Sequence, residues 1–318
     1  MMPEPSRAPR CPDSRVAFVV RIPRRILLAA VAALSLSSCG ALTPADEAFS
    51  VNGTATTRDE LDAVLSDLAA AGDLTLDNGE AGDEIVRTIL RQLIRIETFR
   101  QFAEDEGLEV TDADREEILG FAAGDAAFRA YSDLLQGIIV DLNVIDLVLS
   151  RASARAAGEL AVAYEESPAS TGMLCLSHIL VATRGDADRV LARLDEGADF
   201  AELAAEVSVE PAAVVSGGAL AGADGEPCQP LTEFQRGYDG DFLAGAVRGR
   251  AGIPYGPVRT QFGWHVILNR PFADVADSLG RVSAAAPGAV AFEGYLADAD
   301  VRVSSRYGRW VRGLSSIA

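Results

Sequence analysis

Two short apolar segments, each with one histidine, constrain the fold more than any other feature of the chain. They span residues 176–181 (LSHILV) and 260–267 (TQFGWHVI), and they hold the only two histidines among 318 residues. Short apolar runs bounded by turn residues are typical of buried strands. Between them lie a helical pattern, a Gly-Gly turn and a Gly-Pro turn. A lone histidine in such a strand is more often a core residue with satisfied hydrogen bonds than a functional one.

The N-terminus has the pattern of an export signal. Six arginines precede an apolar run at 26–36, which leads into Leu36-Ser37-Ser38-Cys39. The run is too short to span a bilayer core of ~30 Å as a helix. The pattern matches a bacterial lipobox and predicts a signal peptide at 1–38, a lipid on Cys39, and an extracytoplasmic, membrane-anchored protein. The alternative is a plain signal peptide with a chance cysteine.

Charge and cysteine content narrow the possible partners and compartments. The net charge of −19 argues against nucleic acid, because phosphate contacts need clustered basic residues. Cys11 leaves with the predicted signal peptide and Cys39 takes the lipid. Cys175 and Cys228 are then the remaining thiols in an oxidising compartment, which favours a disulfide between them. Two buried, unpaired cysteines are the alternative.

A series of short motifs surrounds the two histidines. In chain order they are SHILV at 177–181, DFAELA at 199–204, VSVEP at 207–211, GGAL at 217–220, and a stretch at 242–258 that ends in Gly-Pro-Val. This order resembles the parvulin family of peptidyl-prolyl cis-trans isomerases. The sequence departs from the family at Ala219, where the family has aspartate. It also has Ala-Gly-Ala at 221–223 instead of an aromatic pair, and a longer loop between Leu220 and Phe242.

The resemblance implies the catalytic residues. His178 and His265 would face each other as the polar floor of a proline pocket. Glu210 stands where parvulins have cysteine or aspartate, and Thr260 matches their hydroxyl beside the second histidine. Glu210 can equally be a solvated carboxylate in a turn.

The resemblance also implies an apolar pocket wall, although ordinary core residues would give the same pattern. Its members would be Leu220, Tyr238, Phe242 and Phe262. Rotation about an X-Pro bond must overcome a barrier of ~18–20 kcal/mol that arises from amide resonance. An enzyme lowers this barrier by binding the twisted amide better than the planar one. We therefore expect no metal and no cofactor.

The rest of the chain has mostly helical patterns. Thr57 and Glu60 form a capping box that opens a helix, and Thr111 starts another. Helices are also expected at 83–106, with Ile85, Ile89, Leu93 and Ile96 on one face, and at 125–150, with Phe128, Tyr131, Leu135, Ile138 and Leu142 on one face.

This order of elements resembles the SurA and PrsA type of extracytoplasmic foldases. In that type the chain returns from the isomerase unit to complete the helical domain, so we expect a strand at 301–304 to pair with one at 49–52. The expected fold class is α+β. A mostly helical, chaperone-like domain at 39–168 is completed by 272–318, and a parvulin domain at 172–271, a small antiparallel sheet surrounded by helices, is inserted in it.

Three functions are compatible with these patterns. The first is a lipid-anchored prolyl isomerase that acts on unfolded secreted polypeptides with X-Pro bonds. The second is a chaperone that binds unfolded polypeptide through a degenerate parvulin domain without useful turnover. The third is a purely structural envelope lipoprotein. The histidine pair favours the first, whereas the altered turn at Ala219 and the longer loop favour the second.

Overall fold

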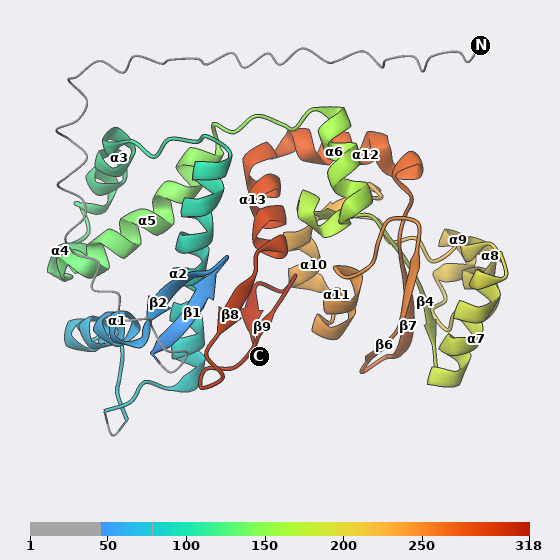
Figure 1. Ribbon diagram of the computed structural model, residues 1–318, viewed down its shortest axis with the longest axis horizontal. Helices are drawn as coiled ribbons and strands as arrows, with labels where there is room; N and C mark the ends of the chain where they lie inside the picture. The colour runs from blue at the N-terminus through green and yellow to red at the C-terminus, as the bar shows by residue number, and fades with distance from the viewer. Residues whose placement is uncertain (1–45, 78) are drawn as a thin grey trace, which may run out of the picture. The chain divides into compact units, whose positions relative to one another are not determined.

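The computed structural model describes residues 46–77 and 79–318 (Figure 1). The predicted signal peptide at 1–38 and the predicted lipidation site, Cys39, lie outside these residues. Within the described ranges, no helix is both long enough and apolar enough to cross a membrane. The fold is α+β, as predicted.

Side-chain caps begin the first helices where the sequence predicts them. Thr57 and Thr111 each accept a hydrogen bond from the backbone three residues later, and Glu60 and Asp114 reach back to complete two capping boxes. The helices of this part are α1 (Arg58–Ala71), α2 (Asp83–Asp105), α3 (Asp112–Ala122), α4 (Ala126–Ala130), α5 (Asp133–Leu149) and α6 (Ala157–Glu166).

The fully buried face of α2 is centred one residue from the predicted one, although Ile89 and Leu93 of the predicted face also pack against the same core. Val86, Leu90 and Ile94 are buried, whereas Ile85 is 43% exposed. Because α2 carries adjacent apolar pairs, its sequence contains two overlapping stripes. Packing against β1 and α13 buries the second stripe.

The predicted helix at 125–150 is interrupted, which corrects that prediction. Tyr131 is extended, with ψ of 155°, and Ser132 starts α5 by accepting a hydrogen bond from the Leu135 N–H. Asp125 caps the short α4 in the same way. Two good N-cap residues therefore define two helices where apolar periodicity alone indicated one.

The first sheet joins the two ends of the described chain. Its order is β2 (Thr54–Thr57), β1 (Glu47–Val51) and β8 (Val301–Val303), all antiparallel. Phe49 pairs with Val303 and Val51 with Val301, which confirms the predicted pairing.

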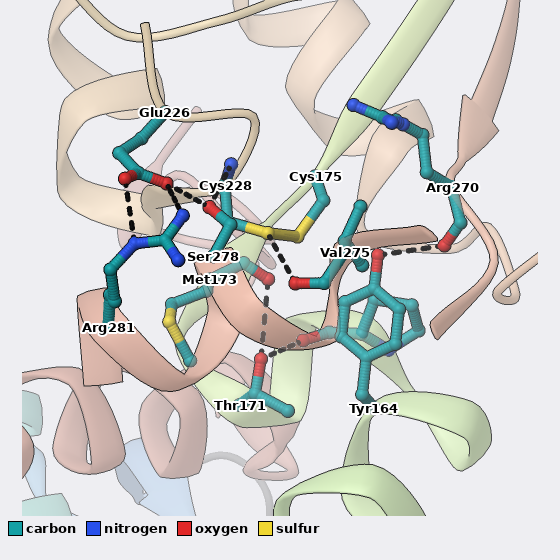
Figure 2. Close-up of a disulfide and its surroundings, with 11 residues drawn as sticks. Tyr164, Thr171, Met173, Cys175, Glu226, Cys228, Arg270, Val275, Ser278 and Arg281 are labelled. Atoms are coloured by element: carbon teal, nitrogen blue, oxygen red, sulfur yellow. Dashed lines mark hydrogen bonds and ion pairs between the residues drawn. A yellow bond between two sulfur atoms is a disulfide. The ribbon is translucent and has the colours of Figure 1, made fainter. Parts of the chain in front are cut away.

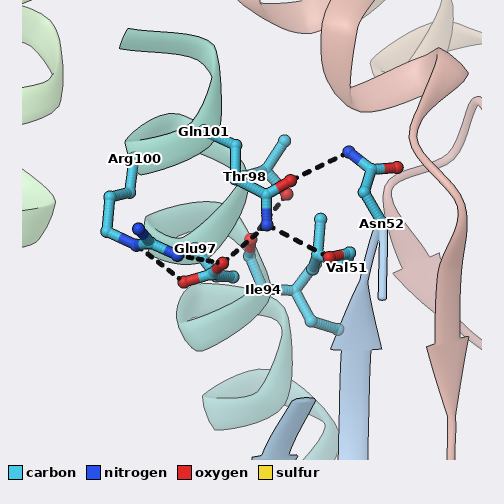
Figure 3. A network of polar contacts seen from close by, with 7 residues as sticks. All are labelled: Val51, Asn52, Ile94, Glu97, Thr98, Arg100 and Gln101. Atoms are coloured by element: carbon cyan, nitrogen blue, oxygen red, sulfur yellow. Dashed lines mark hydrogen bonds and ion pairs between the residues drawn. The ribbon is translucent and has the colours of Figure 1, made fainter. Parts of the chain in front are cut away.

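A polar network ties β1 to α2 (Figure 3). Gln101 donates to the Val51 carbonyl at 3.1 Å and accepts from the Asn52 amide at 2.9 Å. Glu97 accepts from both Gln101 and Arg100. These contacts fix β1, the central strand of the sheet that β8 completes.

The second sheet carries both histidines. Its order is β4 (Leu176–Val181), β7 (Gly263–Asn269) and β6 (Pro254–Thr260), all antiparallel. The helices of this part are α7 (Arg184–Asp195), α8 (Phe200–Val207), α9 (Ala213–Ser216), α10 (Leu231–Gly237) and α11 (Gly240–Ala246). The 3-10 helix η1 (Pro168–Thr171) and the short pair β3 (Met173–Leu174) and β5 (Gln229–Pro230) complete the segment.

The segment between Leu220 and Phe242 is not a continuous loop, contrary to the prediction. It contains β5 and α10, and Leu231 and Phe234 of α10 are fully buried. The inserted residues thus add an ordered helix with an apolar face to the core beneath the histidine sheet.

α13 (Pro287–Asp298) links the apolar cores of the described chain. It follows α12 (Phe272–Ala285) and precedes β8, β9 (Trp310–Val311) and β10 (Ser316–Ile317). Four of its residues enter four different core clusters: Val290, Phe292, Leu296 and Ala297.

The helix η1 packs directly on α13. A Cβ at Gly172, where φ is +72°, would lie 1.8 Å from the Val290 carbonyl oxygen, and a Cβ at Gly294 would lie 2.2 Å from the Ser170 carbonyl oxygen. Only glycine permits this approach at either position, because any added side chain would overlap the backbone.

Candidate active site

Strand register places the two histidines on one face of the sheet. His178 pairs with Ile267 and Leu180 pairs with His265, so the histidines are diagonal neighbours across β4 and β7. Side chains of residues two apart on a strand share a face, and diagonal neighbours come within reach of each other. The alternate residues Ile179 and Val266 pack on the opposite face, against α7 and α8.

A chain of hydrogen bonds runs through the pair. The Nδ1 atoms of His178 and His265 lie 3.1 Å apart, and the two ring planes differ by 13°. Nε2 of His178 lies 2.5 Å from Glu210 Oε2, and Nε2 of His265 lies 2.9 Å from Thr260 Oγ1. The structure therefore brings together all four predicted catalytic residues.

Burial keeps both rings uncharged at neutral pH. His178 and His265 are 7% and 5% exposed. Desolvation lowers the pKa of His178, and the Glu210 carboxylate opposes this effect in part. Desolvation and the neighbouring His178 lower the pKa of His265 to about 4.

With both rings neutral, the hydrogen bonds from Thr260 to Glu210 can all be donated in the same direction. If the Glu210 carboxylate accepts from His178 Nε2–H, then His178 Nδ1 must accept from His265 Nδ1–H. His265 Nε2 then accepts from the Thr260 hydroxyl, whose oxygen accepts from the Phe262 N–H at 3.1 Å. Each neighbour thus fixes the tautomer of the next ring.

The turn that carries Glu210 is fastened to β4. Ser208 Oγ accepts from the Leu180 N–H at 3.2 Å, and the Val209 N–H donates to the Leu180 carbonyl at 2.8 Å. Sequence reasoning missed Ser208, although it stands in the VSVEP motif two residues before Glu210. The Glu210 side chain is 37% exposed, so it connects the buried rings with solvent.

Gly218 contacts the backbone of the strand that carries His178. Its carbonyl accepts from the His178 N–H at 2.9 Å. Its φ is +77°, and a Cβ there would lie 2.3 Å from the His178 carbonyl oxygen. The Gly-Gly turn is therefore required by the close approach of this loop to β4, whichever residue follows it.

Phe242 forms the apolar side of the site. Its ring meets both histidines edge to face, with centroids 5.5 Å from His178 and 5.1 Å from His265. Tyr238 lies nearly parallel to Phe242 at 5.7 Å, and Leu220 packs against the same cluster. Phe262 is 66% exposed in the turn between β6 and β7, so its place in the predicted wall stays a prediction.

The predicted disulfide is present and lies beside the site's first strand (Figure 2). Cys175 directly precedes β4, and Cys228 lies in the inserted segment. The Cys228 N–H donates to Ser278 of α12, which also donates to Glu226, and Glu226 pairs with Arg281. The bond ties the inserted segment to the start of β4, and the contacts with Ser278 and Arg281 hold it on α12.

The histidine pair is not arranged as a metal site. In residues 46–77 and 79–318, no group of three or more His, Cys, Asp or Glu side chains could hold a metal ion. The ring nitrogens of the pair face each other, Thr260 and Glu210, so each has a hydrogen-bond partner within the site.

Comparison with known families agrees with this site. Residues 164–269 match the family described as the PPIC-type PPIASE domain. The chain therefore contains a PPIC-type peptidyl-prolyl isomerase domain, which confirms the parvulin resemblance of its motifs.

The relatives of this domain are foldases by name. The foldase protein PrsA of Clostridium kluyveri is 39% identical over 104 residues, which cover 33% of this chain and 27% of that protein. PrsA of Clostridium acetobutylicum is 38% identical over 104 residues, with 33% and 28% covered. The chain thus spans about a quarter of the length of these curated relatives.

Solved structures give a weaker likeness. The crystal structure of PrsA from Bacillus subtilis covers 82% of this chain and 96% of its own, at 20% identity and a TM-score of 0.27. At this TM-score no detail of that structure transfers to the present chain.

Proposed function

We propose that the chain is a peptidyl-prolyl cis-trans isomerase that assists the folding of secreted polypeptides. The observation that carries the proposal is the continuous hydrogen-bond chain from Thr260 through both histidines to Glu210, set against the ring of Phe242. The match of residues 164–269 to the PPIC-type domain and the foldase names of the relatives support it.

The chemistry follows from what rotation of an X-Pro bond requires. The twisted amide loses resonance, and an enzyme accelerates rotation by binding this state better than the planar one. Dipoles that are already oriented stabilise a changing charge distribution without reorganising. Two neutral rings with fixed tautomers, next to an aromatic ring that can contact proline, provide such a site.

The same features argue against a purely binding role. A degenerate site would not need to bury two imidazoles and to hold Glu210 through Ser208. The departures at Ala219 and at 221–223 lie on the loop next to Gly218, and the backbone contact of Gly218 with His178 is intact. The hydrogen-bonded core of the site is therefore compatible with turnover.

The proposal extends to domain roles and location. The helical part at 39–168, completed by 272–318, would hold unfolded segments while the unit at 172–271 isomerises them. The lipobox would anchor the protein outside the cytoplasmic membrane through Cys39. A Cys39→Ser variant should then leave the membrane fraction, and extraction of that variant by detergent alone would refute the anchor.

The activity has a direct test. A soluble form that begins after Cys39 should accelerate a protease-coupled assay on a proline peptide, and His265→Ala should remove most of the acceleration. Turnover that is equal in the wild type, His178→Ala and His265→Ala would show that this site does not catalyse the reaction.

A further inference from the structure

A cavity of about 720 Å³ lies beside β6, next to the sheet that carries the histidines. Its lining comes from α11, from β6 and from the C-terminal segment around β9. Four arginines line it: Arg248, Arg259, Arg309 and Arg312.

These arginines are not neutralised by neighbouring carboxylates. Over residues 46–77 and 79–318, none of the four takes part in a salt bridge, in contrast to surface arginines such as Arg236 and Arg302, which do. The charge stands out in a chain with a net charge of −19.

Two carboxylates also line the cavity, and they do not balance the arginines. Asp239 accepts hydrogen bonds from the backbone N–H groups of Asp241 and Phe242, so its charge is used to cap α11. Asp241 is exposed on the first turn of that helix. The lining therefore holds four arginines and two aspartates, which makes it positively charged, although Arg259 lies over the Trp264 ring at 5.9 Å and Arg312 donates to the Asp298 carbonyl.

The walls also suit an extended polypeptide. β6 is an edge strand that pairs only with β7 in the described sheet, and the edge of a sheet is a site where an extended segment can add. Trp310 and Leu314 give the cavity an apolar side.

We propose that this cavity binds an extended, acidic segment of a polypeptide. Charge complementarity selects acidic residues, the edge strand selects an extended backbone, and Trp310 selects apolar residues between the acidic ones. Val258 lines the cavity and pairs with His265 in the sheet. A client held here would therefore lie on the strand next to the histidine pair. That the bound segment is a client of the isomerase rests on the proposed function. Binding of an acidic segment in the cavity does not depend on it.

The two tryptophans of the chain allow a direct measurement. Trp264→Phe leaves Trp310 as the single tryptophan. The probe is a short peptide in which Glu alternates with Val and which contains no proline, so that binding does not depend on the isomerase site. We expect saturable change in Trp310 fluorescence that weakens with added salt, since exposed charges are screened.

Variants locate the binding. Arg248→Gln with Arg309→Gln should weaken binding of the Glu peptide by about five- to tenfold, the range expected for loss of two exposed charge contacts. Arg302→Gln with Arg306→Gln removes the same charge outside the cavity and should leave binding unchanged. If the first pair fails to fold, as judged by circular dichroism, Arg248→Gln with Arg259→Gln replaces it.

Several results would overturn the proposal. One is that the matching Gln peptide binds as tightly as the Glu peptide. Another is that the control pair of variants loses as much binding as the cavity pair. A third is that inorganic polyphosphate binds more tightly than the Glu peptide, which would indicate a general anion site. Failure of the proposed function is a separate outcome. If the wild-type protein binds the Glu peptide but does not turn over proline peptides, the proposal for the cavity stands and the proposed isomerase function fails.

Discussion

His178 and His265 meet through their Nδ1 atoms at 3.1 Å, although 87 residues separate them in the chain. Replacing either by alanine removes a link from the hydrogen-bond chain and leaves its neighbour unpaired. We expect proline-peptide turnover to fall by about tenfold or more, as for loss of one preorganised donor. The matched control is Thr98→Ala, which removes a buried hydrogen bond in α2. It should lower stability and retain turnover.

The pH dependence of stability should report the burial of His265. Its pKa falls from 6.5 to about 4 on folding, so between these values the unfolded chain binds a proton that the folded protein does not. Stability should therefore be constant with respect to this group above pH 6.5. It should be lost as the pH falls to 4, by about 3 kcal/mol in total. Urea unfolding of wild type and His265→Gln at several pH values measures this, and a wild-type profile parallel to that of the variant would contradict it.

Glu210 should control the protonation of His178. The carboxylate is the group that raises the pKa of His178 against the effect of burial, so Glu210→Gln should lower this pKa further. With two histidines in the chain, an NMR titration resolves each ring. Glu206→Gln removes the same charge from a salt bridge with Arg193 and should leave the His178 titration unchanged. A shift of equal size in both variants would indicate a long-range charge effect instead.

Loss of the disulfide should destabilise the isomerase unit. The bond joins residues 53 apart, and the chain-entropy treatment values a loop of that length at about 4 kcal/mol. Cys175→Ala with Cys228→Ala should lower the free energy of unfolding by up to this amount. In the wild type, reductant should have a similar effect. An unchanged unfolding midpoint after verified reduction would show that contacts such as Arg281–Glu226 hold the segment without the bond.

Gly172→Ala should test the contact between η1 and α13. The new Cβ would overlap the Val290 carbonyl oxygen, so one element must move, at a cost of about 3 kcal/mol or more. Gly197→Ala is the control: φ is also positive there, at +94°, but nothing lies within 4 Å of the added Cβ. It should cost only about 1 kcal/mol of backbone strain. Similar thermal midpoints for the two variants would mean that η1 moves away from α13 easily.

The sequence predicted those parts of the site that depend on rare residues. The histidines stood out by their rarity, and the resemblance to parvulins placed Glu210 and Thr260 beside them, with a solvated turn carboxylate as the alternative for Glu210. The pairing of residues 49–51 with 301–303 was also predictable, from the resemblance to foldases. The protein contains just two histidines, which left few arrangements to consider.

Features that depend on tertiary packing were not predictable. The α2 stripe was misplaced because Ile85 and Val86 are both apolar, and only contact with β1 and α13 decides between them. The insertion before Phe242 was expected to be a loop because the resemblance to parvulins places a loop there. Burial of Leu231 and Phe234 makes part of it a helix. No local sequence pattern indicated that α13 would contribute residues to four different core clusters.

The strand pair β1–β8 has a consequence for the order in which the protein can fold. The Asp300 N–H donates to Asn52 across a separation of 248 residues, and contacts this distant in the chain form late because closing a long loop costs entropy. Because the chain is synthesised from its N-terminus, Phe49 and Val51 have no strand partner on the β8 side until residues 301–303 have been made. The sheet that carries the histidines uses residues 176–269 alone, so it can form before that moment. The candidate proline site can thus be assembled while the helical part still lacks its last strand.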